Sequence, residues 1–189
     1  MPNKKPRIMN DYRDLFWSLI PLVLIAVVFA GLTSQCSFAA NGPTQGTVPS
    51  FDAATALRSD AQNLRFPVRE PALPENWKPN SGSRDTITAA GGGTVSTIGY
   101  ITGAGTYMEL NQSDATEEVL LDHVVGRRYA TGTHETGGEK WVVYDEPDAE
   151  PAWVADFGDS RVLIRGAGDT AAFETLAAAV TAAKPLPSR

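Results

Sequence analysis

The sequence has very little cysteine and histidine. Cys36 is the single cysteine, and His123 and His134 are the only histidines among 189 residues. One cysteine excludes an intrachain disulfide, so an ordinary hydrophobic core must stabilise the fold. The two histidines do not share a spacing with cysteine or with each other that is typical of a zinc site. We therefore predict no metal site and no cofactor.

Basic charge is also scarce after the first fourteen residues. That tail carries four basic and two acidic residues, and the rest of the chain carries twelve basic and twenty acidic residues, a net charge of −8. A surface with this excess of negative charge repels phosphate groups. The composition therefore argues against nucleic acid and anionic lipid head groups as partners of the larger part.

Long apolar runs are absent except for one, residues 15–32 (LFWSLIPLVLIAVVFAGL), which has no charged residue. As a helix it would be roughly 27 Å long, just under the hydrocarbon thickness of a bilayer. Basic residues precede it, and the next charged residue after it is Asp52. The positive-inside rule then predicts a single-pass protein of the cell membrane, with a cytoplasmic tail at residues 1–14 and the remainder outside.

Two alternatives exist for this run. Ser37 and Ala39 are small residues at the two positions that signal peptidase reads, which would suit a cleaved secretory signal. A lipid-modified Cys36 is disfavoured, because Gln35 precedes it where a small residue is needed. The run is longer than a usual signal core, and Trp17 lies where an interfacial anchor would lie, so we favour an uncleaved transmembrane helix.

After a flexible linker at residues 33–50, residues 51–189 have the size of one exported domain, which we expect to be monomeric. Apolar residues at helical spacing predict a helix over residues 51–64, with Asp52 as its cap, and another over residues 170–183, with Asp169 as its cap. Four prolines predict an extended edge segment over residues 66–79. A short helical turn is expected at residues 117–124.

β-Branched and aromatic stretches between glycine-rich breaks predict the strands. Their expected ranges are 86–89, 95–102, 106–112, 128–134, 140–144, 152–157 and 161–165. No crossover helices are present for a parallel sheet. The fold class is therefore α+β, an antiparallel meander of about six or seven strands covered on one face by an N-terminal and a C-terminal helix.

No group of residues predicts a catalytic reaction. Ser160 follows Gly158-Asp159 as in some serine esterases, but both histidines precede it and the next residues read as a strand, so we interpret this segment as a hairpin turn. The acidic run at residues 145–150 lacks the pattern of a calcium loop and is interpreted as a solvated turn. An enzyme would need carboxylates in a cleft, for example Glu109 or Asp122 near His134.

The candidate binding residues lie around one strand and two tryptophans. Tyr107, Glu109 and Asn111 alternate with Met108 and Leu110, which predicts a polar row facing out and an apolar row facing the core. Gln112 and Ser113 carry the strand into a loop, where recognition residues are common. We therefore name as candidates Tyr107, Gln112, Ser113, Trp141 and Trp77. The alternative is that they pack in the core, satisfy the strand end or cap the next turn.

Several different short motifs follow one another in a characteristic order along the chain, beginning with the apolar run and its basic tail. They include Phe66-Pro67-Val68, Leu73-Pro74-Glu75-Asn76-Trp77, Gly99-Tyr100-Ile101-Thr102, Tyr107 to Ser113 and Trp141-Val-Val-Tyr144. In this the chain resembles domain of unknown function 4245, a group of membrane-anchored actinobacterial envelope proteins. The resemblance implies an envelope location and no known activity.

These observations predict a membrane-anchored binding or protein-interaction module outside the cell membrane. The alternative is a carrier that holds a lipid-like ligand in a cavity between sheet and helices, and an uncharacterised hydrolase comes third. A deep pocket lined by Leu, Ile, Val and aromatic residues would favour the carrier. A filled core with an exposed aromatic residue would favour the interaction module.

Overall fold

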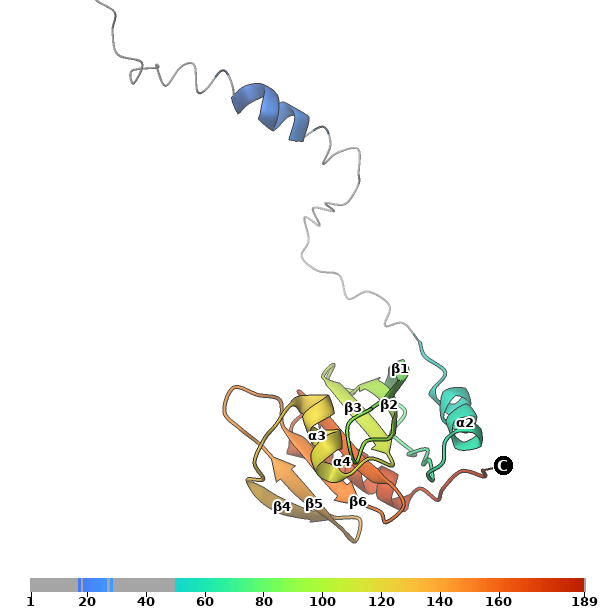
Figure 1. Ribbon diagram of the computed structural model, residues 1–189. Coiled ribbons are helices and arrows are strands. Elements are labelled where there is room, and N and C mark those ends of the chain that lie inside the picture. The colour runs from blue at the N-terminus through green and yellow to red at the C-terminus, as the bar shows by residue number, and fades with distance from the viewer. Residues whose placement is uncertain (1–16, 18, 27, 29–49, 189) are drawn as a thin grey trace, which may run out of the picture. The chain divides into compact units, whose positions relative to one another are not determined.

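The computed structural model describes residues 17, 19–26, 28 and 50–188 (Figure 1). Residues 17, 19–26 and 28 are helical. Within the described ranges, no helix is both long enough and apolar enough to cross a membrane. The predicted cytoplasmic tail, part of the predicted span and nearly all of the predicted linker lie outside the described residues. Residues from 50 onward belong to a compact unit of their own.

Two helices begin at the predicted capping residues. Helix α2 (Ala53–Asn63) follows Asp52, whose carboxylate accepts a hydrogen bond from the Thr55 N–H at 3.0 Å. This bond holds the pKa of Asp52 below its ordinary value. Helix α4 (Thr170–Ala182) follows Asp169, which accepts from the Ala172 N–H at 2.9 Å. Each cap satisfies an N–H group that the first turn leaves without a partner.

Seven strands form one antiparallel sheet in the order β1-β2-β3-β7-β6-β5-β4. Their bounds are β1 Lys78–Thr86, β2 Thr94–Ile101, β3 Tyr107–Ser113, β4 Gly132–Thr136, β5 Glu139–Tyr144, β6 Ala152–Asp156 and β7 Arg161–Gly166. The predicted simple meander is wrong, because β3 pairs with β7 rather than β4. Residues 114–131, which include helix α3 (Glu117–Val125), carry the chain from β3 to the far edge.

Two predicted strand positions also differ. The first strand lies at Lys78–Thr86 and not at residues 86–89. Pro79 is compatible with this strand because β1 is an edge strand, where one side of the backbone needs no ladder bond. Strand β4 begins at Gly132 rather than residue 128. The Arg128 side chain, which precedes the strand, donates to the Glu150 carbonyl at 2.5 Å.

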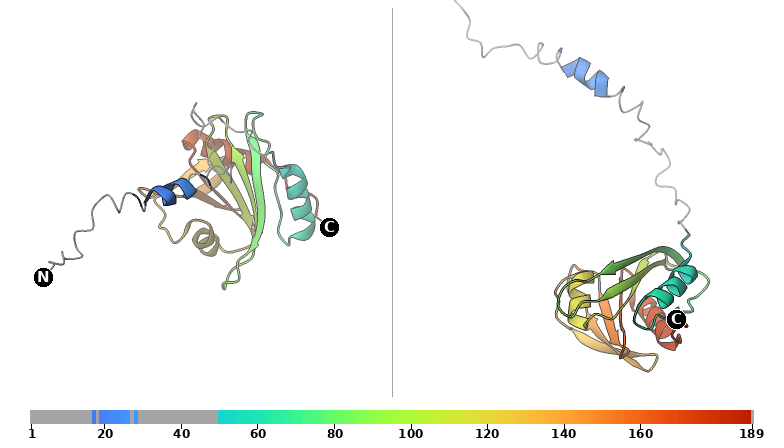
Figure 2. Two further views of the ribbon diagram at one scale, coloured as in Figure 1. Left: turned by 90° about the horizontal axis from the view of Figure 1, so that it is seen from above. Right: turned by 45° about the vertical axis from the view of Figure 1, so that its right-hand side comes forward.

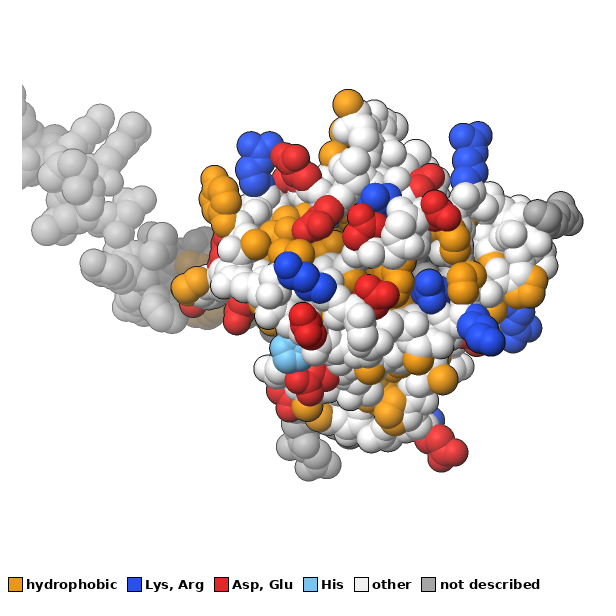
Figure 3. Space-filling view, turned by 90° about the horizontal axis from the view of Figure 1, so that it is seen from below, with side chains coloured by type: hydrophobic (Ala, Val, Ile, Leu, Met, Phe, Trp, Pro, Cys, Tyr) orange, Lys and Arg blue, Asp and Glu red, His pale blue; other side chains and the backbone are white. Residues whose placement is uncertain are grey.

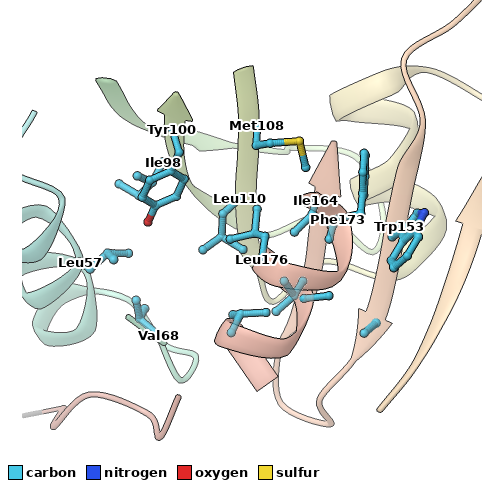
Figure 4. Packing of buried hydrophobic residues seen from close by; sticks show 14 of the residues in the cluster. Leu57, Val68, Ile98, Tyr100, Met108, Leu110, Trp153, Ile164, Phe173 and Leu176 are labelled. Atoms are coloured by element: carbon cyan, nitrogen blue, oxygen red, sulfur yellow. The ribbon is translucent and has the colours of Figure 1, made fainter. Parts of the chain in front are cut away.

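The sheet is covered on both faces and not on one. Helices α2 and α4 pack on the first face through Leu57, Phe173 and Leu176, which lie against the sheet residues labelled in Figure 4. Helix α3 packs on the opposite face through Leu120 and Leu121, in a second apolar cluster. The view from above in Figure 2 shows α2 and α3 on opposite sides of the sheet. The segment expected to be only a helical turn is thus a nine-residue helix that buries its own apolar side chains.

Candidate functional site

A groove of about 560 Å³ lies beside strand β4 and the first turn of α4. We call it the β4–α4 groove. Its walls come from the start of β4, the end of β5, the start of β6 and the segment that caps α4. The lining includes Gly132, His134, Val143, Trp153, Asp169 and Phe173. A volume of this size is within the range of small-ligand sites.

Three rings in series form one wall of the groove. The rings of His134 and Trp153 lie 4.5 Å apart between centroids with an interplanar angle of 35°. Trp153 in turn lies 5.2 Å from Phe173. The His134 Nε2 atom is 3.0 Å from the Glu174 Oε1 atom, which fixes the imidazole from the side of α4. Trp153 and Phe173 are almost fully buried, so this wall is held rigidly by the core.

Two loops meet at the rim of the groove. The segment before β4 carries Tyr129, whose exposed fraction of 80% is the largest of any large hydrophobic side chain described. The Tyr129 N–H lies 3.4 Å from a carboxylate oxygen of Glu146, in the acidic loop at residues 145–150. Thr131 and Asp145, one from each loop, line the groove. Exposed tyrosines are common on recognition surfaces, and Tyr129 lies two residues before the lining residue Thr131.

The charged side chains that line the groove are acidic. Asp145 and Asp169 contribute carboxylates, and neither Lys nor Arg is among the lining residues. By contrast, Figure 3 shows a face on which acidic, basic and apolar side chains are interspersed. The groove therefore offers rings, hydroxyl groups and negative charge to a ligand.

Within the part of the chain that the structure describes, the residues considered as catalytic or metal-ligating candidates lie apart from one another. Ser160 is buried in the β6–β7 turn, where its carbonyl accepts from the Phe157 N–H at 2.9 Å, as predicted for a hairpin turn. Within the described residues, no three His, Cys, Asp or Glu side chains are grouped so that they could hold a metal ion. Glu109 and His134 line different hollows on opposite faces of the sheet.

A second, smaller hollow of about 230 Å³ lies on the α3 side of the sheet, above a polar network. Arg165 donates to both carboxylate oxygens of Glu109, from Nε at 2.9 Å and from Nη2 at 3.1 Å. The Asn111 amide and the Tyr107 hydroxyl donate to the same carboxylate at 3.0 and 3.1 Å. Each oxygen of the Glu109 carboxylate thus accepts two hydrogen bonds, and Asn111 is itself held by Thr97 at 2.8 Å.

The network shifts the pKa values of its members. Burial acts to raise the pKa of Glu109, but hydrogen bonds from Arg165, Asn111 and Tyr107 outweigh it and hold that pKa below its ordinary value. The hydrogen bond to Glu109 raises the pKa of Arg165. Burial raises the pKa of Tyr107. At neutral pH the charged Glu109–Arg165 pair is therefore the stable form.

The five predicted binding residues do not share one environment. Trp141 is fully buried in the main core, and Ser113 is fully buried, with its hydroxyl accepting from the Ala115 N–H at 3.0 Å. Gln112 is buried and bonded to Arg69. Tyr107 is half-buried in the Glu109 network. Trp77 is half-buried against the core, 6.5 Å from the ring of Tyr100. A binding role for these five residues stays a prediction.

The prediction that the polar row of β3 is exposed is wrong for two of its members. Met108 and Leu110 face the core as predicted. Glu109 and Asn111 point to the other face, also as predicted, but both are buried. The reason is the partner on β7: Arg165 is paired with Glu109 in the register and covers the carboxylate with its own side chain.

Sequence reasoning did not find the groove. Its rings come from β4, β6 and α4, which are far apart in the sequence and are joined by the non-sequential strand order. From the sequence, the acidic run at residues 145–150 is interpreted as a solvated turn, because no local pattern shows that the segment around Tyr129 lies beside it. Tyr129, an isolated aromatic between Arg128 and Ala130 in a segment of weak strand character, was the one available local signal.

Comparison with known proteins identifies the family of the chain. No curated protein and no solved structure matches the chain. Residues 7–180 match the sequence model of the family described as Protein of unknown function (DUF4245). Because the match spans most of the chain, the protein belongs to this family of proteins of unknown function.

Proposed function

We propose that the protein is a binding module of the cell envelope, anchored in the cell membrane by residues 15–32, and that its exported domain holds a partner in the β4–α4 groove. The observation that carries the proposal is the groove itself. It joins a rigid ring wall with hydroxyl groups and carboxylates, and the exposed Tyr129 lies two residues before the lining residue Thr131. Such a combination supports recognition without chemistry.

The filled core supports a binding module over a carrier. Leu57, Leu110 and Leu176, which lie between the sheet and the helices, are each 1% exposed or less. The groove is lined by Thr, Asp, Gly and His as much as by apolar side chains. A lipid-like ligand would desolvate the carboxylates of Asp145 and Asp169 without offering them a hydrogen-bond donor, which is costly.

Membrane attachment is supported by the sequence. The uncharged run at residues 15–32 and the basic tail before it favour an N-terminus in the cytoplasm and a domain outside. The negative charge of the exported part keeps it soluble beside an anionic membrane surface. A tethered domain of this kind meets partners in the space next to the membrane.

A photo-crosslinking experiment in the native envelope tests the proposal. A benzophenone amino acid in place of Tyr129 in the full-length chain should give a discrete adduct, and the same group in place of Ser83 on strand β1 should not. The second variant, Gly132→Leu, should lose the adduct. Gly132 lines the groove, and a Cβ atom added there meets no atom within 4 Å, so the position has room for a leucine side chain that would occupy part of the groove. Adduct formation that Gly132→Leu leaves unchanged would refute a role for the groove.

A further inference from the structure

Resting on the proposed function, we propose that the partner is an extended peptide segment carrying lysine or arginine, which adds as an eighth strand to the outer edge of β4 and places a basic side chain in the β4–α4 groove. Strand addition is a common mode of peptide recognition: the main chain supplies affinity, and pockets for alternate side chains supply specificity. The edge, the groove and the charge each support one part of this inference.

The first part is the open edge of β4. This strand ends the sheet and pairs only with β5. Among the described residues, no main-chain hydrogen bond reaches β4 from outside the sheet. The opposite edge differs, because the Phe51 N–H donates to the Pro79 carbonyl of β1 at 3.2 Å, and Arg84 of β1 pairs with Asp60 of α2. An added strand therefore has a free template at β4.

The second part is the position of the groove relative to that edge. His134 pairs in register with Trp141, which faces the main core, so alternation places Gly132, His134 and Thr136 on the same face as α4. Gly132 has open space where a side chain would begin, and it lines the groove. A residue of an added strand opposite Gly132 would thus point its side chain into the groove without a clash.

The third part is the sign of the charge. The lining carries Asp145 and Asp169, and the adjoining loop adds Glu146 and Asp148. Two arginines precede Tyr129, but neither lines the groove, and Arg128 donates to the Glu150 carbonyl. An ammonium or guanidinium group would find carboxylates there and the rings of His134 and Trp153 beside it, whereas a carboxylate would be repelled.

The experiment measures binding of model peptides to the full-length chain in an uncharged detergent. The probes are a labelled octapeptide of alternating Lys and Val, its counterpart of alternating Glu and Val, and the Lys peptide with all of its main-chain nitrogens methylated. The Lys peptide should bind saturably and slow amide hydrogen exchange in β4. The methylated peptide should bind at least about tenfold more weakly, because it cannot pair with the edge. The Glu peptide should not bind at up to about 1 mM.

Three variants locate the site. Gly132→Leu should abolish binding, and the double variant Asp145→Asn, Asp169→Asn should weaken it about five- to tenfold and flatten its salt dependence. Asparagine is as good a helix cap as aspartate, so α4 is preserved. Asp122→Asn, an exposed site on α3, removes one charge elsewhere and should change little.

The outcomes separate the two proposals. No binding of the Lys peptide, equal binding of the Lys and Glu peptides, equal binding of the methylated peptide, or protection of β1 instead of β4 would overturn the basic-strand inference. In each of these cases a Tyr129 adduct that Gly132→Leu removes would still uphold the groove as the binding site. If the Lys peptide binds as expected but the adduct survives Gly132→Leu, the proposed function in the envelope fails by itself.

Discussion

The side-chain amide of Gln112 forms hydrogen bonds with both main-chain groups of Arg69. The amide oxygen of Gln112 accepts from the Arg69 N–H at 2.8 Å, and its NH₂ group donates to the Arg69 carbonyl at 2.9 Å. The side chain thus acts as a short piece of strand for the proline-rich segment that precedes β1. Arg69 is fixed further by a cation–π contact of its guanidinium group with Phe157 and by an isolated antiparallel β-bridge between its backbone and that of Pro185. The buried Gln112 therefore links strand β3 to the proline-rich segment through its side chain.

Replacing Gln112 by methionine should lower the free energy of unfolding by about 2–3 kcal/mol. Methionine fills a similar volume but leaves the N–H and carbonyl of Arg69 without partners, and each unpaired buried group costs about 1–3 kcal/mol. Chemical unfolding of the full-length chain measures the change. The matched control, Gln62→Met on the exposed side of α2, should stay within about 0.5 kcal/mol. Equal effects of the two variants would contradict the role of Gln112.

Trp141 should behave as a packing residue. It is fully buried, and within the described residues its Nε1 atom has no hydrogen-bond partner. Trp141→Ala should therefore cost about 3–5 kcal/mol through the cavity it leaves. Trp141→Phe should cost clearly less, because it removes part of the ring and no hydrogen bond. A cost below about 1 kcal/mol for the alanine variant, measured in the same unfolding assay, would instead point to a recognition role.

The helix caps and the core face of β3 could be predicted from the sequence, because each depends on residues that are close together along the chain. Asp52 and Asp169 were identified as caps, and the alternation of Met108 and Leu110 assigned the core face of β3 correctly. Strand order was not accessible, since the pairing of β3 with β7 is a long-range contact with no local signature. The burial of Glu109 depended on the same pairing, which places Arg165 opposite it. The groove, built from β4, β6 and α4, was hidden for that reason too.

Acid should destabilise the domain partly through Glu109. Its pKa is lower in the folded state than in the unfolded chain, where a glutamate titrates near about 4.3, so the unfolded state binds more protons as the pH falls. The stability contributed by Glu109 is complete above its unfolded pKa and is lost as the pH falls through the folded pKa. Unfolding measured from pH 7 to pH 3 should show a smaller loss for Glu109→Gln, which is less stable at pH 7 but lacks this titration.

The control for this pH series is Glu75→Gln at an exposed carboxylate. It should leave the pH dependence of unfolding close to that of the unmodified chain. If Glu109→Gln and the unmodified chain lose the same free energy of unfolding between pH 7 and pH 3, the Glu109–Arg165 pair does not contribute in the way that its geometry indicates.

The proposed membrane anchor gives the last prediction. If residues 15–32 remain as an uncleaved span, the intact mass of the purified protein includes the N-terminal tail, and the protein stays in the membrane pellet after carbonate washing. Protease added outside protoplasts should then digest all but a short N-terminal piece. Leu24→Arg should release or misplace part of the protein, because a charge near the centre of a span costs about 2.5–3.5 kcal/mol in insertion, whereas Leu24→Phe should have no effect. A soluble form that begins near Ala40 would show instead that the run is a cleaved secretory signal.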